Sequence, residues 1–148
     1  MQARNPQFRE RVIEIIERAD FIQLLGMEFT DAGAGWCETR MPLANRHRQQ
    51  DGFVHAGVQA TMADHTAGCA AFTLIDAAHH VLTIEFKINL LRPALGEALI
   101  CRGEVLRGGR RVIVAESAVS ARAADGSETL CAKATVTLAV VNPAEAGS

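Results

Sequence analysis

The residues with the clearest potential for chemistry lie near the middle of the chain. Residues 52–57, with the sequence GFVHAG, lead into a segment of helical character that contains Asp64. The first turn of a helix presents unpaired N–H groups and a partial positive charge, which together bind anions and stabilise developing oxyanions. The small side chains of Ala56 and Gly57 would let a bulky group approach that backbone. A carboxylate two turns further along could act as a general base or as a nucleophile.

Asp64 is unusual for its position, because aspartate is a poor residue for the interior of a helix. It follows Ala60 by four residues and Gly57 by seven, and further small residues continue the same stripe, namely Ala67, Gly68 and Ala71. A carboxylate on such a face is costly unless it is paired or functional. The residues alone leave two interpretations open: a functional carboxylate in a cleft, or a structural one at a solvated edge or beside an arginine.

The histidines are weaker candidates for acid–base chemistry. His55 stands at the predicted helix start, where a ring that caps the helix is the simpler interpretation and an acid–base role stays open. His65 follows Asp64 directly, but adjacent helical residues do not face one another, so we expect no pairing between them. The remaining histidines are predicted to lie in loops, namely His47, His79 and His80.

Signatures of other catalytic sites are missing from the sequence. No G-x-G-x-x-G motif follows a strand, which argues against a dinucleotide site, and no G-x-S-x-G elbow suggests a serine hydrolase. The cysteines form no C-x-x-C pair, so a metal site is not expected. We expect instead the buried, reduced thiols of a cytoplasmic protein at Cys37, Cys69, Cys101 and Cys131.

Hydrophobic periodicity outlines the elements that would position these residues. It predicts an amphipathic helix over 8–25 and a second helix over 54–75. A polar loop at 45–52 precedes the second helix. The second helix is rich in small residues, which suits the centre of a curved sheet. Strand patterns bounded by Gly, Pro and Asp-Gly turns lie at 27–31, 36–42, 81–91, 97–106, 111–122 and 130–141. This order predicts an α+β fold whose last four strands form an antiparallel meander.

Length and composition fit one globular domain. The chain has 148 residues, of which 49% are hydrophobic and 22% charged, so it can bury a core without metals or disulfides. A net charge of −2 gives no electrostatic footprint for nucleic acid as a partner. The charge is uneven, because residues 1–86 carry 7 basic and 11 acidic groups and residues 87–148 carry 8 basic and 6 acidic groups.

No segment predicts export or membrane insertion. The first residues lack the apolar stretch and small-residue cleavage site of a signal peptide. The longest weakly polar stretch, 54–75, contains His55, Gln59, Asp64 and His65, whose polar side chains argue against a membrane span. We therefore expect a cytoplasmic protein with no membrane partner.

Two motifs taken together resemble the hotdog-fold acyl-CoA thioesterases, specifically the PaaI-like (phenylacetic acid degradation-type) branch. GFVHAG at 52–57, with Met62-Ala63-Asp64 and Gly68, is similar to that family's G-x-x-H-G-G…L-x-D…G pattern. The segment TIEFKINLLRPA at 83–94, with Gly96, is similar to the family's strand and following Arg/Pro-Ala-Gly signature.

The resemblance covers roughly residues 20–141 and implies a hotdog fold, in which a curved antiparallel sheet wraps around a long central helix. An extra N-terminal helix is expected at about 6–25, before a core at about 26–141 and a tail at 142–148, all within a single domain.

The resemblance also implies roles for the residues around the helix start. Asp64 matches the catalytic carboxylate, which acts as general base or nucleophile on a thioester. Ala56 replaces a glycine whose backbone N–H polarises the thioester carbonyl, and the neighbouring Gly57 is expected to contact substrate. His55 matches the motif histidine near that carbonyl. Thr83 matches a hydroxyl residue that orients the attacking water.

Further implied contacts concern the amide and basic side chains. Gln49 falls where many members have an asparagine that positions substrate or water, and Gln50 is an alternative for that role. Because coenzyme A carries phosphates, basic side chains are expected at the rim of its binding site, namely Arg92, Arg107, Arg110 and Arg111. The alternative is that these arginines are only solvated charges of the hairpins. No cofactor is expected, since coenzyme A is part of the substrate. In this family the site lies across a homodimer interface, and dimers pair into tetramers.

The sequence therefore favours hydrolysis of an acyl-CoA thioester, with an aryl or medium-length acyl chain, to the free acid and CoA. A hotdog dehydratase or hydratase is an alternative, although such enzymes usually pair a histidine with a carboxylate across the site. A non-catalytic acyl-CoA-binding module is a second alternative, kept open by the departures at Ala56 and Gln49. An oligomeric scaffold that binds no thioester is a third.

Overall fold

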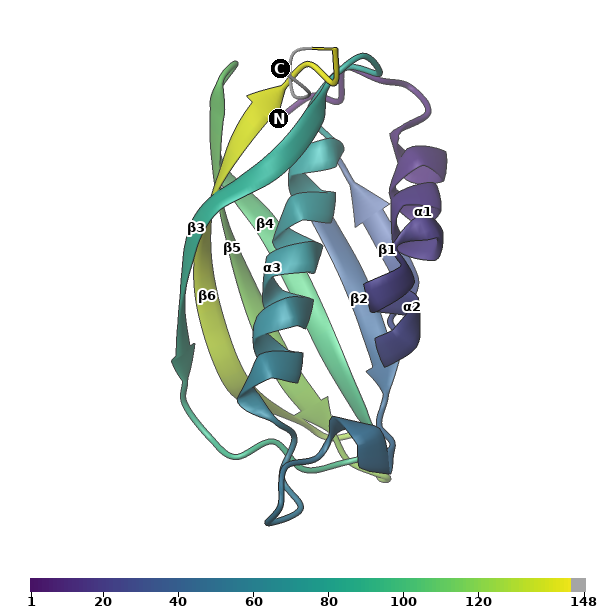
Figure 1. The fold of residues 1–148 in the computed structure, drawn as a ribbon, viewed down its shortest axis with the longest axis vertical. Helices are drawn as coiled ribbons and strands as arrows, with labels where there is room; N and C mark the ends of the chain where they lie inside the picture. Colours follow the sequence, from purple (N-terminus) through teal and green to yellow (C-terminus); the bar gives the residue numbers. More distant parts are fainter. Residues whose placement is uncertain (145–148) are drawn as a thin grey trace.

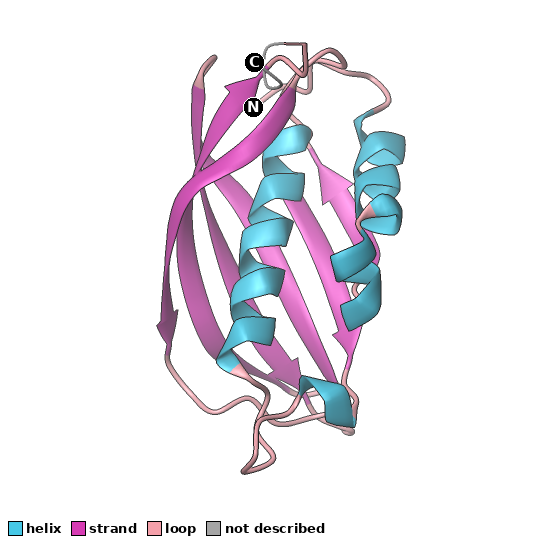
Figure 2. Cartoon of the chain, viewed as in Figure 1, coloured by secondary structure: helices cyan, strands magenta, loops and turns pink. Residues whose placement is uncertain are grey.

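Six antiparallel strands form one curved sheet around a long helix in the computed structural model, which describes residues 1–144 (Figure 1). Two short helices lie beside that long helix, on the same side of the sheet (Figure 2). The order of the strands across the sheet is β1-β2-β4-β5-β6-β3. In chain order the elements are α1 (Phe8–Arg18), α2 (Asp20–Leu25), β1 (Glu28–Gly33), β2 (Trp36–Pro42), the 3₁₀ helix η1 (Asn45–His47), α3 (Ala56–Phe72), β3 (His80–Leu90), β4 (Ala98–Gly108), β5 (Val112–Arg122) and β6 (Glu128–Val141).

The structure confirms the predicted hotdog architecture and every predicted strand to within two residues or so at each end. Its strand order differs from a simple meander, because β3 pairs with β6 and not with the next strand, β4. One side of β4 pairs with β2 and the other with β5, so β4 has no free edge for β3. Residues 91–97 cross between the two strands, and β3 is left at the edge of the sheet.

The small residues of α3 let the sheet approach it closely. A Cβ atom added to Gly103 on β4 would lie 2.7 Å from the carbonyl oxygen of Thr66, so only glycine fits there. Two polar contacts fix the helix against the sheet: Ser117 donates to the Ala63 carbonyl at 2.8 Å, and the hydroxyls of Thr39 and Thr66 are 2.7 Å apart. These contacts set the rotation of α3 and therefore the direction in which its outer face points.

The predicted helix over 8–25 is wrong in one respect, because the structure divides it into α1 and α2. Ala19, at φ −81° and ψ 98°, is extended between them. The Gln23 side chain donates to the Ile16 carbonyl at 2.9 Å and so satisfies a backbone acceptor that the break leaves free. Gly26 ends α2 in the left-handed conformation, at φ 75°, which glycine adopts without steric cost.

Other departures concern the ends of elements. The central helix runs over Ala56–Phe72 and is shorter than the predicted 54–75. His80 begins β3, and His47 is fully buried in η1, so neither is the loop residue that the sequence predicted. His79 does lie in a loop, where its ring bonds to Asp76. Of the predicted tail at 142–148, residues 145–148 lie outside the described residues.

All four cysteines are free and buried, as the sequence predicted. Burial raises the pKa of the Cys101 thiol to about 12. A thiol of that kind carries no thiolate at neutral pH, so it packs as a small apolar group.

Candidate active site

The start of α3 is built around His55. Its Nδ1 accepts a hydrogen bond of 2.9 Å from the Gly57 N–H, so the ring caps the helix and Nε2 carries the proton in the neutral form. This confirms the capping interpretation for His55. The N–H of Ala56 has no acceptor within the helix, because it belongs to the first turn. A helix of 17 residues therefore offers a backbone donor and the positive end of its dipole at this point.

A pocket of about 530 Å³ opens at this helix start. We call it the helix-start pocket; the residues lining it include Gln49, Gln50, His55, Ala56, Gln59 and Arg92. Five of these were predicted as site residues, so the structure brings them together. Gly57 follows Ala56 directly and supplies the N–H that His55 caps.

The two loop glutamines are already engaged in hydrogen bonds inside their own turn. The Asp51 N–H donates to the Gln49 side-chain oxygen, and the Gln50 side chain donates to the Asp51 carboxylate at 3.0 Å. Each side chain engages one end of its carboxamide in these bonds, namely the Gln49 oxygen and the Gln50 nitrogen.

His47 is a positioning residue that the sequence did not single out. Its Nδ1 accepts from the Ala44 N–H at 2.9 Å, and its Nε2 bonds to the Leu25 carbonyl at 2.7 Å. Its own carbonyl accepts the His55 N–H at 2.8 Å. His47 thus ties the end of α2 to the loop that enters α3. Its place within a run of polar residues gave no signal of burial.

Asp64 lies on the outer face of α3, in a second pocket of about 620 Å³ between α1, α3 and β3. We call this the carboxylate pocket. Thr83 on β3 donates a hydrogen bond of 2.8 Å to Asp64 Oδ1. No ion pair within residues 1–144 includes Asp64. The structure therefore does not show the pairing with an arginine, which is one of the two structural interpretations of this residue; the other is a carboxylate at a solvated edge.

Partial burial raises the pKa of the Asp64 carboxyl, and the Thr83 hydrogen bond opposes that rise. A half-buried carboxylate with one hydroxyl partner and an open pocket in front of it has the environment of a general base or nucleophile. Next to it, burial lowers the pKa of His65 to about 4, so this ring is neutral at physiological pH.

Within one chain, Asp64 and the Ala56 N–H are too far apart to act on the same bond. They are separated by eight positions along α3, which is about 12 Å at the rise of an α-helix. The carboxylate and the backbone donor occupy different pockets.

The edge of the sheet that β3 forms lies beside both pockets. β3 lines the carboxylate pocket at its start and the helix-start pocket at its end. It exposes large apolar side chains, with Leu82 55%, Ile84 58% and Leu90 50% accessible. An apolar strand with unpaired backbone groups is a template for pairing with another strand.

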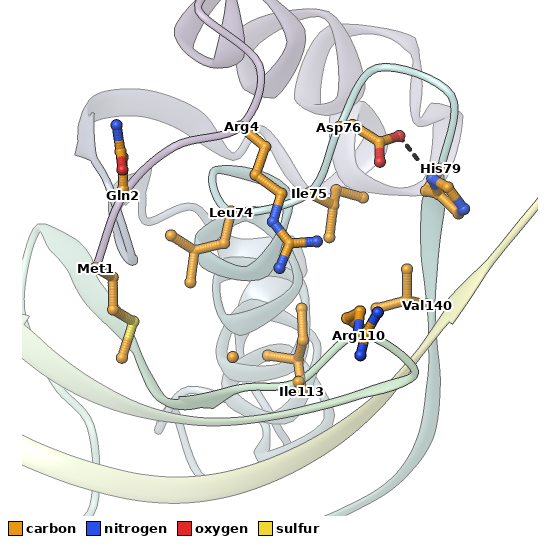
Figure 3. Close-up of a pocket in the computed structure, with 12 residues that line it drawn as sticks. Met1, Gln2, Arg4, Leu74, Ile75, Asp76, His79, Arg110, Ile113 and Val140 are labelled. Atoms are coloured by element: carbon orange, nitrogen blue, oxygen red, sulfur yellow. Dashed lines mark hydrogen bonds and ion pairs between the residues drawn. The ribbon is translucent and has the colours of Figure 1, made fainter.

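The four candidate arginines do not meet within one chain. Arg92 borders the helix-start pocket, whereas Arg107, Arg110 and Arg111 lie at the β4–β5 turn, at the other end of α3 (Figure 1). The 11 residues of β4 separate these ends by about 36 Å. Figure 3 shows Arg110 and Arg4 at a cavity of about 480 Å³, near the pair that His79 Nδ1 makes with Asp76 at 2.5 Å.

Two further features bear on the site. Among residues 1–144, no group of three or more His, Cys, Asp or Glu side chains is arranged to hold a metal ion. In the same part of the chain, no helix combines the length and the apolar character needed to cross a membrane.

Comparison with known proteins adds independent information. A family model described as the thioesterase superfamily matches residues 51–128, which include Ala56, Asp64 and Thr83. A Saccharolobus solfataricus protein carrying the name "Putative esterase" is 35% identical over 114 residues, covering 76% of this chain and 79% of its own. A Pasteurella multocida protein of the same name is 28% identical over 130 residues, covering 88% and 91%.

Solved structures show the same likeness. The crystal structure of a thioesterase family protein from Silicibacter pomeroyi superposes with a TM-score of 0.88 at 36% identity, covering 91% of this chain and 98% of that one. A thioesterase from Haemophilus influenzae, at 24% identity and a TM-score of 0.82 over 96% of each chain, shares the fold.

Proposed function

Because the chain belongs to the thioesterase superfamily, we propose that it hydrolyses acyl-CoA thioesters to a free acid and coenzyme A. The observation that carries this proposal is the half-buried Asp64 carboxylate, which has no cationic partner within residues 1–144 and is hydrogen-bonded to Thr83 beside an open pocket. Membership of this family supports thioester hydrolysis, and acyl-CoA as the substrate is the part of the proposal that we add.

The reaction needs an oxygen nucleophile and a donor for the oxyanion. Asp64 takes a proton from a water, and the water oxygen attacks the thioester carbonyl carbon; alternatively Asp64 attacks that carbon directly and water hydrolyses the resulting anhydride. The carbonyl oxygen becomes an oxyanion, which the Ala56 N–H stabilises at the helix start. When the carbonyl re-forms, the C–S bond breaks and the thiolate of coenzyme A leaves and takes up a proton.

We further propose that the two halves of this site come from two copies of the chain. The separation of Asp64 from Ala56 along α3 and the exposed apolar edge of β3 support this arrangement. If two β3 strands pair in antiparallel fashion, the start of each lies beside the end of the other. The carboxylate pocket of one copy then faces the helix-start pocket of its partner. Pairing of such dimers into tetramers stays an expectation.

The same pairing would also bring candidate arginines of the two copies close together. Arg92 follows the end of β3, and the turn with Arg110 lies near the start of β3. Antiparallel strands therefore bring Arg92 of one copy toward Arg107, Arg110 and Arg111 of the other. A cluster of guanidinium groups from both copies suits the phosphates of coenzyme A.

The test is release of free thiol from a panel of acyl-CoAs with aryl, short, medium and long chains. We expect hydrolysis by the wild type and its loss in Asp64→Ala. Binding of acyl-CoA without turnover would instead identify a binding module, and absence of binding in calorimetry would remove acyl-CoA as the ligand.

A further inference from the structure

Gln59 is a buried side chain with an unsatisfied acceptor. It is 3% exposed, yet its Oε1 has no hydrogen-bond partner within residues 1–144. On the same helix, Thr66 bonds to Thr39, and the Thr61 hydroxyl donates to the Gly57 carbonyl at 2.8 Å. His65 Nε2 is the other buried polar side-chain atom of α3 without a partner within residues 1–144, and His65 lines the carboxylate pocket. A buried acceptor without a donor is unfavourable, and an apolar residue of similar size would fill the position better.

The position of Gln59 indicates where its donor must come from. Gln59 lines the helix-start pocket together with Ala56. It follows Ala56 by three residues, so the two share a face of α3, about 4.5 Å apart along the axis. The terminal torsion of a glutamine is soft, so its carboxamide can turn its oxygen toward the pocket. A ligand held at the Ala56 N–H would place its next groups beside Gln59.

We propose that Gln59 Oε1 accepts a hydrogen bond from the amide N–H of the pantetheine arm and so selects pantetheine thioesters. This inference rests on the proposed function, in which the thioester carbonyl lies at the Ala56 N–H. In coenzyme A the donor nearest the thioester sulfur is an amide N–H, two methylene groups away. That spacing matches one helical turn between the two contacts.

The other polar groups of the pocket do not serve this purpose. The Gln49 oxygen already accepts the Asp51 N–H, and Gln50 is bonded to the Asp51 carboxylate. Arg92 carries donors only, and it donates to the Leu130 carbonyl at 3.1 Å. Gln59 is therefore the side chain of this pocket whose acceptor is both buried and unengaged.

The test uses two small thioesters of the same acyl group. One is the N-acetylcysteamine thioester, which keeps the amide N–H, and the other is the S-(2-acetoxyethyl) thioester, in which an ester oxygen replaces that N–H. We expect the wild type to prefer the first by about threefold to tenfold in kcat/KM, the range of one neutral hydrogen bond. Gln59→Met, which keeps the length and loses the acceptor, should bring the ratio close to one, whereas Gln59→Glu keeps an acceptor and should keep the preference.

Controls separate this inference from the proposed function. Gln7→Met changes an exposed glutamine at the start of α1 and should leave the preference of the wild type unchanged. Hydrolysis of both thioesters by the wild type with no preference would overturn the inference alone, as would an unchanged preference in Gln59→Met. A wild-type ratio of one overturns the inference even if Gln59→Met fails to fold, and Gln59→Leu then provides a second variant without the acceptor. No hydrolysis of either thioester or of any acyl-CoA would overturn the proposed function as well.

Discussion

Thr83, on the edge strand β3, donates a hydrogen bond of 2.8 Å to Asp64, in the middle of the central helix. This contact holds one carboxylate oxygen of a side chain that lines the carboxylate pocket. It also sets two influences against each other, because burial raises the pKa of Asp64 and the hydroxyl lowers it. The contact joins the helix that carries the carboxylate to the strand at which we expect a second copy to pair.

Asp64→Asn should remove the activity while the chain stays folded. The amide is close in shape to the carboxyl, so Thr83 can still bond to it, but it cannot take a proton from water or attack a carbonyl. We expect kcat to fall by about 10²-fold or more, the usual effect of losing a general base. Thiol release under saturating acyl-CoA measures this, and a rate within a few-fold of the wild type would show that Asp64 is structural.

The same substitution should stabilise the folded chain at neutral pH. The pKa of Asp64 is raised in the folded state, so the charged carboxylate there costs stability above that pKa. The cost disappears as the pH falls through the folded pKa and the group becomes neutral. Asp64→Asn should therefore raise the Tm by about 1–4 °C at pH 7. Thermal melts at pH 7 and at pH 3.5 test the sign, since the difference must shrink at the lower pH.

Thr83→Val should move the acid limb of the pH–rate profile to higher pH. Asp64 must be deprotonated to act, so activity is present above its pKa and is lost as the pH falls through it. Removing the hydroxyl removes the contact that lowers this pKa, and burial then acts unopposed. Profiles of kcat/KM against pH for both proteins show the shift. Thr83→Ser keeps the hydroxyl and should keep the acid limb of the wild type; an unmoved limb in Thr83→Val would contradict the coupling.

Ala56→Pro should remove the proposed oxyanion donor without breaking the helix. Proline is tolerated at the first helical position, and His55, at φ −60° and ψ 138°, already has the extended conformation that precedes proline. We expect kcat to fall by about 10²-fold, as when an oxyanion donor is lost. Circular dichroism should show an unchanged helix content.

Mixing the two inactive variants tests whether the site is shared. If Asp64 and Ala56 act across an interface, a heterodimer of Asp64→Asn and Ala56→Pro contains one intact site. Random re-association should then restore about a quarter of the wild-type activity. If both residues of a site came from one chain, every mixture would stay inactive.

For the candidate site, the sequence predicts the positions that depend on residue type within one local motif. His55, Ala56 and Asp64 lie on or beside a single helix, so their spacing alone placed them. Whether the four candidate arginines lie together depends instead on which end of the sheet each strand reaches. Arg92 and Arg107 lie near opposite ends of β4. Linear spacing carries no information about which end of a strand a residue faces.

The missed residues are polar groups whose burial arises from tertiary packing. His47 sits in a polar run that reads as solvated, and only the fold places it between α2 and the start of α3. In the sequence, Gln59 is only a polar residue that argues against a membrane span. The break at Ala19 also has no local signal, because alanine is the best helix former and tertiary contacts of α1 and α2 override it.

Ile84→Lys should weaken self-association at the edge strand. Ile84 is 58% exposed on β3 and the single chain does not bury it, so the change should leave the fold intact. In a symmetric pair of β3 strands the introduced lysine appears twice in the interface, and the cost of removing both charges from water opposes pairing. We expect sedimentation velocity to show a smaller species and specific activity to fall on dilution.

Leu106→Lys is the matched control, because Leu106 is 53% exposed on β4, away from the edge that β3 forms, and should keep the assembly of the wild type. An unchanged assembly and full activity in Ile84→Lys would place the interface elsewhere and remove the antiparallel β3 pairing on which the shared site depends.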